Sequence, residues 1–318
     1  MSAAGLQQAG AASPPVDAVM VKRRVAQFTS RSIKTSMKAD GLRLAMSMVD
    51  LTTLEGKDSP EKVRALCAKA MRPAGGSGSL KRPIPPVAAV CVYPTLVRTA
   101  REALGDSGVK VAAVATGFPS GQYPLDVRLR DVADAVDAGA DEIDMVISRG
   151  LFLAGHFDEI AREIQETKAA CRHAHLKIIL ETGELETLDN ARRASDLVIE
   201  AAMRVPGAKP LEDGEVFIKT STGKVQPAAT MPVTLVMLQA IADTHRRGGP
   251  RIGMKPAGGI RTAKSALHYL VMVKETLGDA WLAPHLFRFG ASALANDLLR
   301  QILKLERGTY AAAWDLAE

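Results

Sequence analysis

Two lysines lie inside short apolar segments, a place where lysine is unusual. Lys219 occurs in Phe-Ile-Lys-Thr-Ser-Thr-Gly-Lys, and Lys255 occurs in Gly-Met-Lys-Pro-Ala-Gly-Gly-Ile-Arg. Buried lysine is rare unless its ammonium group is paired or has a function. Side chains alternate along a strand, so Lys219 shares a face with Phe217 and Ser221. If the lysine-bearing faces of two adjacent strands point into one closed sheet, two ammonium groups compete for the same small volume.

Such a pair of ammonium groups would make one lysine a nucleophile. The pKa of a free lysine is about 10.4, so roughly one in a few thousand is neutral at pH 7. A second positive charge ~4–5 Å away costs about 3–4 kcal/mol at an effective dielectric constant of ~20, which lowers this pKa by roughly two to three. A neutral amine attacks a carbonyl and forms an imine, whose nitrogen is an electron sink. For either lysine alone, the alternative is a strand end that reaches solvent. We predict that Lys219 is a Schiff-base nucleophile, with Asp144 taking and returning protons and Lys255 in support.

The elements that would position these residues are visible in the hydrophobic pattern. Eight apolar, Val/Ile/Met-rich runs bounded by Gly or Pro are typical of strands buried on both faces. They span residues 44–52, 87–93, 111–117, 142–148, 176–181, 216–221, 251–255 and 286–289. Segments of helical period follow several of them, at 95–104, 125–138 and 157–174. Another helix is expected to begin at Asp58-Ser59-Pro60-Glu61, which combines a capping residue, Pro at the first helical position and an early acid.

This alternation predicts an α/β fold with a parallel sheet and crossover helices. Eight is also the number of strand–helix units that closes a barrel. The alternative is an open doubly wound sheet, but no Gly-x-Gly-x-x-Gly follows any predicted strand. We predict a single (β/α)₈ TIM-barrel domain over residues 41–308, with surface insertions at 72–86 and 205–214. An N-terminal extension over 1–40, disordered to about residue 20 and helical over 21–40, precedes the barrel, and a tail over 309–318 follows it.

Three loops are candidates for anion binding. In barrels of this kind the active site lies at the C-terminal ends of the strands, and the loops after strands seven and eight commonly bind phosphate at a helix N-terminus. The candidate residues are Gly258 and Gly259 after strand seven, Gly290 and Ser292 after strand eight, and Thr222, Gly223 and Lys224 after strand six. A tight turn alone explains the glycines of either loop equally well. Because both pairs fall at the two expected loops, they predict a phosphate cradle.

Composition restricts the class of ligand. The 318 residues include 41 Lys and Arg against 35 Asp and Glu, a net charge of +6. The basic residues are scattered, and no basic stripe with interleaved aromatics indicates nucleic-acid binding. A small anionic substrate fits this charge. No apolar run approaches the ~18 residues needed to cross a membrane, so no membrane partner is predicted.

The cysteines and histidines point away from disulfide or metal chemistry. Three widely spaced cysteines, Cys67, Cys91 and Cys171, do not form a disulfide framework and fit the reducing cytoplasm. Residues 1–35 faintly resemble a transit peptide, but a disordered extension is the preferred interpretation. The one close histidine pair, His173 and His175, precedes predicted strand five, at the wrong end of a barrel. We therefore expect no metal site and no cofactor.

Seven motifs, in family order, resemble those of the 2-deoxyribose-5-phosphate aldolases. They are VDLTTL at 49–54, AAVCVYP at 88–94, ATGFPSG at 115–121, ADEIDMVI at 140–147, EVFIKTSTGK at 215–224, GMKPAGGIR at 253–261 and FGAS at 289–292. The resemblance covers about residues 40 to 305 and is closest to the longer form found in animals. It implies reversible cleavage of 2-deoxy-D-ribose 5-phosphate to acetaldehyde and D-glyceraldehyde 3-phosphate in deoxyribonucleoside catabolism, without a metal or organic cofactor.

The resemblance also implies roles for individual residues. Lys219 matches the Schiff-base lysine, Asp144 the proton-relay carboxylate, and Lys255 the lysine that perturbs the nucleophile. The remaining matches are Asp50 and Thr52 near the substrate hydroxyls, Cys91 lining the site, and Lys224, Gly259 and Ser292 on the phosphate side.

Two departures from the family pattern stand out. Ala293 replaces the second serine that many bacterial members carry after strand eight, and the chain ends in Asp-Leu-Ala-Glu rather than in the tyrosine that enters the site of some members. Two alternatives stay open: a class I aldolase for another small aldehyde or sugar phosphate, and a catalytically silent phosphate-binding barrel. The expected partner is a small phosphorylated sugar, and the choice between a monomer and a homo-oligomer is left open.

Overall fold

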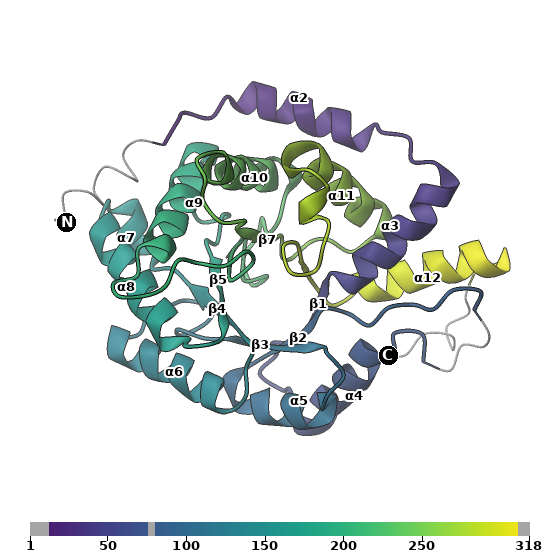
Figure 1. Ribbon diagram of the computed structural model, residues 1–318, viewed down its shortest axis with the longest axis horizontal. Coiled ribbons are helices and arrows are strands. Elements are labelled where there is room, and N and C mark those ends of the chain that lie inside the picture. The colour runs from purple at the N-terminus through teal and green to yellow at the C-terminus, as the bar shows by residue number, and fades with distance from the viewer. Residues whose placement is uncertain (1–12, 76–79, 311–318) are drawn as a thin grey trace.

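Eight parallel strands form a ring at the centre of the molecule (Figure 1). The computed structural model describes residues 13–75 and 80–310. The strands are β1 (Val49–Thr52), β2 (Ala89–Val92), β3 (Lys110–Val114), β4 (Glu142–Val146), β5 (His175–Ile179), β6 (Val216–Lys219), β7 (Gly253–Lys255) and β8 (Phe289–Ala291). They pair in the order β7-β6-β5-β4-β3-β2-β1-β8. Isolated parallel bridges, Met254 with Phe287 and Ala257 with Gly290, join β7 to β8 and close the ring. The predicted (β/α)₈ barrel is confirmed.

Helices surround the ring and cover the outer faces of its strands (Figure 1). Those within the barrel units are α4 (Pro60–Met71), α5 (Val97–Leu104), α6 (Leu125–Asp137), α7 (Arg149–Leu153), α8 (Phe157–Ala170), α9 (Leu188–Met203), α10 (Met231–Arg246), α11 (Ala263–Leu277) and α12 (Leu294–Arg307), with short 3₁₀ turns η1 (Pro94–Leu96) and η2 (Asp279–Trp281). The main apolar core lies between the sheet and these helices. Helix α4 begins as expected, since Ser59 accepts a hydrogen bond from the Lys62 amide and Pro60 is its first residue.

The N-terminal region differs from its prediction in two ways. The single helix expected over residues 21–40 is wrong, because the chain forms two helices, α2 (Ala18–Thr29) and α3 (Thr35–Ser47). The expected strand over 44–52 is also wrong at its start, since β1 begins only at Val49. The cause is that the end of α3 is apolar on its buried face, at Leu42, Ala45 and Met46, and runs into the strand without a polar boundary.

Helix α2 lies outside the helical ring, whereas α3 lies beside α11 and α12 and leads into β1 (Figure 1). Helix α2 packs on α10 and α11, and α3 packs on α11 and α12 (Figure 1). The predicted disorder to about residue 20 is wrong where α2 begins, at Ala18. Residues 1–12, for which disorder was also predicted, and residues 311–318 of the tail lie outside the described residues. The predicted insertion at 205–214 contains no helix or strand, and neither do the described residues of 72–86.

Candidate active site

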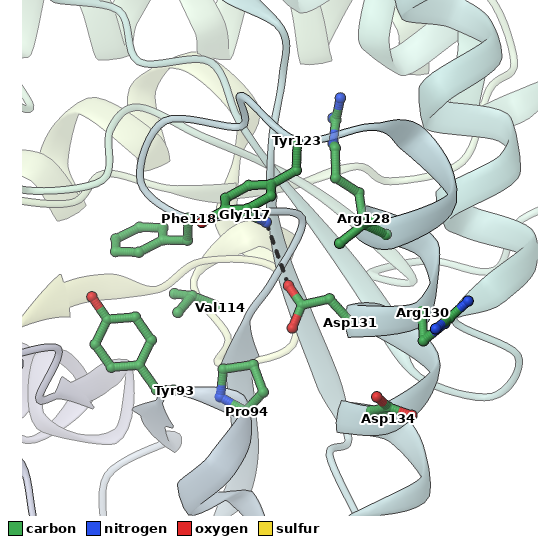
Figure 2. A pocket seen from close by; sticks show the side chains of 11 residues that line it. Tyr93, Pro94, Val114, Gly117, Phe118, Tyr123, Arg128, Arg130, Asp131 and Asp134 are labelled. Carbon is green, nitrogen blue, oxygen red and sulfur yellow. Dashed lines mark hydrogen bonds between the residues drawn. The ribbon is translucent and has the colours of Figure 1, made fainter.

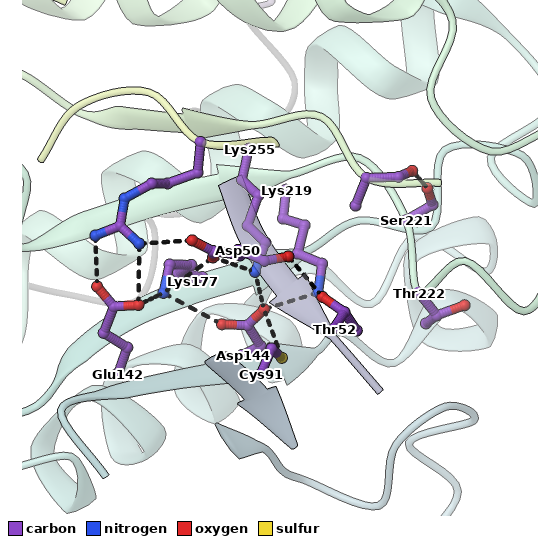
Figure 3. Close-up of polar contacts among 12 residues, drawn as sticks. Asp50, Thr52, Cys91, Glu142, Asp144, Lys177, Lys219, Ser221, Thr222 and Lys255 are labelled. Carbon is purple, nitrogen blue, oxygen red and sulfur yellow. Dashed lines mark hydrogen bonds and ion pairs between the residues drawn. The ribbon is translucent and has the colours of Figure 1, made fainter. Parts of the chain in front are cut away.

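A cluster of charged side chains fills the interior of the barrel (Figure 3). Nζ of Lys219 lies 2.7 Å from Oδ2 of Asp144, and Nζ of Lys255 lies 2.8 Å from the same oxygen. Lys255 also contacts Oδ2 of Asp50 at 2.6 Å. All four side chains are buried. The structure therefore brings together the three residues for which sequence reasoning predicted chemistry, and adds Asp50 as their neighbour.

The strand register explains this convergence. Lys219 of β6 is paired with Lys255 of β7, so the two side chains leave adjacent strands at the same height and toward the same side. Gly290 of β8 makes room for Lys255, because a Cβ atom at this glycine would lie 3.2 Å from Cε of Lys255 and 2.7 Å from Cβ of Ala257. A side chain at position 290 would therefore press on the lysine.

The two lysines have opposite pKa shifts. Burial lowers the pKa of Lys219, and the positive charge of Lys255 lowers it further, whereas the Asp144 carboxylate opposes both. Burial also acts against the charge of Lys255, but the carboxylates of Asp144 and Asp50 outweigh it and raise the pKa of Lys255. Lys255 is therefore a fixed cation, and Lys219 is the lysine that can lose its proton.

The carboxylates of the cluster are ionised, and the nearby thiol is not. Burial would raise the pKa of Asp144, but Lys219, Lys255 and a third lysine, Lys177, hold it well below the usual range. Cys91 lies beside this carboxylate, with Sγ 4.0 Å from Oδ2 of Asp144. Burial and the negative charge of Asp144 raise the pKa of Cys91 to about 11, so its thiol stays protonated.

A cavity of about 490 Å³ opens at the C-terminal ends of β1, β6, β7 and β8, and Lys219 lines it. It also brings together the predicted anion-binding residues, namely Thr52, Thr222, Gly223, Lys224, Gly258, Gly259, Gly290 and Ser292. Asp50, Cys91, Asp144 and Lys255 are not among its described lining residues. The nucleophile candidate is thus the member of the charged cluster that a ligand can reach.

Two features shape the loops around this cavity. Gly258 and Gly259 have φ values of +79° and +81°, a left-handed conformation that glycine adopts without strain. After β6, both the amide and the hydroxyl of Thr222 donate hydrogen bonds to the buried carboxylate of Glu181. The Thr222 hydroxyl in turn accepts from the amide of Lys224 at 3.1 Å. The loop that carries Lys224 is therefore anchored from the segment that follows β5.

A second cavity, of about 400 Å³, lies beyond the ends of β2 and β3 (Figure 2). Its walls include the rings of Tyr93, Phe118 and Tyr123. Asp131 of α6 accepts a hydrogen bond from the amide of Gly117, and burial raises the pKa of this aspartate. Asp131 thereby holds the loop after β3 against α6.

No helix within residues 13–75 and 80–310 has the length and apolar character that crossing a bilayer requires. The same residues contain no group of three or more His, Cys, Asp or Glu side chains placed to hold a metal ion.

Comparison with known proteins identifies the family. The sequence pattern of the DeoC/LacD family aldolases matches residues 44–300, which is most of the chain and all eight strands. The chain belongs to the DeoC/LacD aldolase family.

Individual members of this family are similar over nearly their whole length. The deoxyribose-phosphate aldolase of Mus musculus is 45% identical over 310 residues, which cover 95% of this chain and 93% of the mouse protein. The Homo sapiens protein of the same name is 45% identical over 305 residues, with 93% and 92% covered.

Solved structures agree on the fold. The aldolase QR15 superposes with a TM-score of 0.62 at 26% identity, covering 82% of this chain and 99% of that one. The tetrameric deoxyribose phosphate aldolase of Aeropyrum pernix superposes with a TM-score of 0.57 at 23% identity, covering 96% and 100%. The latter likeness concerns the fold alone.

Sequence reasoning missed three members of the charged cluster in this DeoC/LacD aldolase, namely Glu142, Lys177 and Arg288. Lys177 of β5 contacts Glu142 of β4 and lies 3.4 Å from Oδ1 of Asp144. Arg288 contacts Oδ1 of Asp50 at 2.6 Å and Oε1 of Glu142 at 2.8 Å. A signal was available, because each is a charged residue within or beside an apolar strand, on the inward face. Also missed were Lys62, Lys69 and Arg261, which line the 490 Å³ cavity.

Arg288 should prove essential to stability rather than to substrate contact. Arg288→Met leaves Asp50 and Glu142 with one fewer buried cation, and removing one partner of a buried ion pair typically costs about 3–5 kcal/mol. Burial opposes their ionisation, but Arg288 and neighbouring lysines depress the pKa values of both carboxyls. Their stabilisation is therefore present above the unfolded pKa values near ~4 and lost as the pH falls through the folded ones.

Chemical denaturation at several pH values measures this effect. We expect a lower free energy of unfolding for Arg288→Met at neutral pH, and loss of stability beginning at a higher pH than in the wild type. Arg251→Met is the matched control, since Arg251 pairs with Asp213 at the surface, with 41% and 45% of the side chains exposed. Equal, small effects of the two changes would show that the Arg288 contacts do not stabilise the barrel.

Proposed function

We propose that this aldolase cleaves 2-deoxy-D-ribose 5-phosphate reversibly to acetaldehyde and D-glyceraldehyde 3-phosphate. The observation that carries the proposal is the position of Lys219. This lysine has a lowered pKa and lines a cavity together with loops of the type that binds phosphate in TIM barrels. The names of the mammalian relatives support the substrate. Release of acetaldehyde from the phosphorylated sugar, followed by its reduction with NADH and alcohol dehydrogenase, tests it directly.

Lys219 forms the covalent intermediate. Its neutral amine attacks C1 of the open-chain sugar, and the resulting carbinolamine loses water to give an iminium ion. Removal of the proton from the C3 hydroxyl lets its electrons form the C3 carbonyl while the C2–C3 bond breaks. The electron pair of that bond moves into the iminium, which becomes an enamine. Protonation at C2 and addition of water then release acetaldehyde and restore the amine.

Asp144 and Lys255 support these proton transfers in different ways. Oδ2 of Asp144 touches Lys219, so this carboxylate is placed to exchange protons with groups that form at Nζ, directly or through water. Lys255 keeps its proton because Asp144 and Asp50 raise its pKa. Its fixed charge favours the neutral form of Lys219 before attack. It also lowers the basicity of Asp144, so the carboxylate holds a proton only transiently, as that proton passes between the reacting groups and water.

The phosphate would bind at the opposite side of the cavity from the reacting carbon. We assign it to the amide of Gly259, the hydroxyl of Ser292 and the ammonium group of Lys224. The amides of Gly258 and Gly290, which the sequence also suggested, donate instead to the carbonyls of Gly290 and Pro256, so these two glycines shape the loops without binding the phosphate. Thr222 and Gly223 shape the loop that carries Lys224. Thr52, which lines the cavity nearer to the reacting end, would contact the substrate hydroxyls. Asp50 and Cys91 lie behind the cavity wall and would act through Lys255 and Asp144, which they contact. Binding energy from the remote phosphate can then orient C1 at Lys219 and lower the barrier.

Lys224→Met should separate phosphorylated from free sugar. A hydrogen bond to a charged group contributes about 1.5–3 kcal/mol, so kcat/KM for 2-deoxyribose 5-phosphate should fall by about 10- to 100-fold. Activity on 2-deoxyribose, which has no phosphate, should be unchanged. Steady-state kinetics on both sugars measures the difference, and Lys57→Met, which alters an exposed lysine of the β1 loop, is the control. Equal losses on the two sugars would place the phosphate elsewhere.

The location and assembly of the protein are also proposals. We infer that it acts in the cytoplasm, which is consistent with three buried cysteines that form no disulfide. A homo-oligomer would agree with the tetramer described for the Aeropyrum pernix protein, and measurement of the mass in solution tests it.

A further inference from the structure

One carboxylate lies in a cavity that is otherwise cationic. The 490 Å³ cavity is lined by five basic side chains, those of Lys62, Lys69, Lys219, Lys224 and Arg261. Among the described residues that line it, Glu55 is the one acidic side chain. Its Oε1 lies 3.0 Å from Nζ of Lys224. An acid thus occupies part of the cationic surface that an anionic ligand would use.

The turn that carries Glu55 is held in place by Asp58. The buried carboxylate of Asp58 accepts hydrogen bonds from the Glu55 amide at 2.9 Å and from the Thr53 hydroxyl at 2.8 Å, and pairs with Lys62 at 2.5 Å. The Asp58 amide donates back to the Glu55 carbonyl at 3.0 Å. The backbone of Glu55 is therefore fixed, whereas its side chain is 58% exposed and can swing away.

Lys224 faces Glu55 from an equally ordered loop. Its amide is bonded to Thr222, which the buried carboxylate of Glu181 anchors in turn. One third of the Lys224 side chain is exposed, at 33%. Because the backbone already directs Lys224 toward the cavity, the lysine does not need Glu55 for its placement.

We propose that Glu55 is a specificity-determining residue that competes with the substrate phosphate for Lys224. The inference rests on the proposed function, because it takes Lys224 as a phosphate contact. In the unliganded enzyme Glu55 neutralises Lys224. A phosphate dianion that enters the cavity displaces the carboxylate, which turns into solvent. Glu55 thereby weakens the binding of phosphorylated ligands and favours release of the phosphorylated product.

Charge arithmetic gives the sign and size of the effect. An exposed ion pair must be broken before Lys224 can bind phosphate, and the displaced carboxylate stays close enough to repel a dianion. Together these terms correspond to about a three- to tenfold change in affinity at moderate ionic strength. If Glu55 instead oriented Lys224, its removal would weaken binding, so the two roles predict opposite signs.

Glu55→Gln tests the competition, since it removes the charge and keeps the size of the side chain. Titration of the full-length protein with inorganic phosphate, followed by calorimetry, should show a Kd about three- to tenfold lower than in the wild type. KM for 2-deoxyribose 5-phosphate should fall in the same proportion, with kcat/KM for 2-deoxyribose unchanged. Glu61→Gln is the matched control, because this glutamate of α4 is 78% exposed and pairs with Arg64 outside the cavity.

A double variant makes the test specific. In the Lys224→Met background, Glu55→Gln should tighten phosphate binding by a smaller factor, because only the repulsion between the carboxylate and the dianion is then removed. Unchanged or weaker binding by Glu55→Gln alone overturns the competition, and so does a tightening that is equally large without Lys224. The phosphate titration requires no turnover. Failure of the proposed reaction, seen as no cleavage of 2-deoxyribose 5-phosphate by the wild type, is therefore distinguishable from failure of this inference.

Discussion

Lys219→Arg is expected to abolish turnover and covalent trapping together. Incubation of the wild type with substrate and borohydride should reduce the imine and leave a stable adduct on the peptide that contains Lys219. Arginine keeps the positive charge beside Asp144 but cannot form an imine. Activity should therefore fall by at least about 10⁴-fold, the scale lost when the nucleophile of a covalent mechanism is removed. Peptide mass spectrometry and the acetaldehyde assay measure the two effects.

The matched control for this experiment is Lys224→Met. It removes another lysine that lines the same cavity, and its protein should still be trapped on the Lys219 peptide at high sugar concentration. An adduct on Lys255 in the wild type, or substrate turnover without any adduct, would contradict the assignment of Lys219.

Lys255→Leu is expected to lower activity at neutral pH by at least about 10²-fold. Burial lowers the pKa of Lys219 and Lys255 adds to this, while Asp144 opposes it. Without Lys255, the positive charge that opposes the effect of the Asp144 carboxylate is gone. The pKa of Lys219 therefore rises, and the fraction of neutral amine at pH 7 falls. The remaining activity should increase with pH until Lys219 loses its proton. The pH profile of kcat/KM measures this directly.

Two companion measurements separate this electrostatic effect from loss of structure. Lys255→Leu leaves Asp50 and Asp144 with one fewer buried cation, so circular dichroism and thermal unfolding must show that the variant folds. Lys255→Arg retains the charge and should keep the neutral-pH limb of the wild-type profile. A pH profile that does not move in Lys255→Leu would mean that the two ammonium groups do not interact.

Much of the barrel could be predicted because parallel strands covered on both faces leave a strong local pattern. The strand at 44–52 shows the limit. Residues 44–46, Leu-Ala-Met, are as apolar as a buried strand but are also good helix formers, and α3 packs on α11 and α12. Helix propensity and hydrophobic pattern are local properties, whereas the boundary between α3 and β1 also depends on contacts with α11 and α12, near the C-terminal end of the chain.

Lys219 and Lys255 could be predicted as site residues because they fall at corresponding positions of two adjacent strands. Other members of the charged cluster left no such signal. Arg288 and Glu142 meet across 146 positions of sequence, so each looked like an isolated charge. The predicted cause of the Lys219 shift was also incomplete. Sequence reasoning assigned it to Lys255, but burial is the larger cause and Asp144 acts against both. Burial depth is a property of the closed ring and cannot be read from a strand segment.

The pairing of β8, the last strand, with β1, the first, has a consequence for the timing of biosynthesis. Arg288 and Asp50 meet across this part of the ring although 238 positions separate them in sequence. A chain emerging from the ribosome therefore carries Asp50 long before Lys255 and Arg288 exist to neutralise it. Contacts of such long range close late in folding. The nascent polypeptide gains its reactive amine only after the last strand has been made, which keeps a carbonyl-reactive lysine from operating in an unfinished protein.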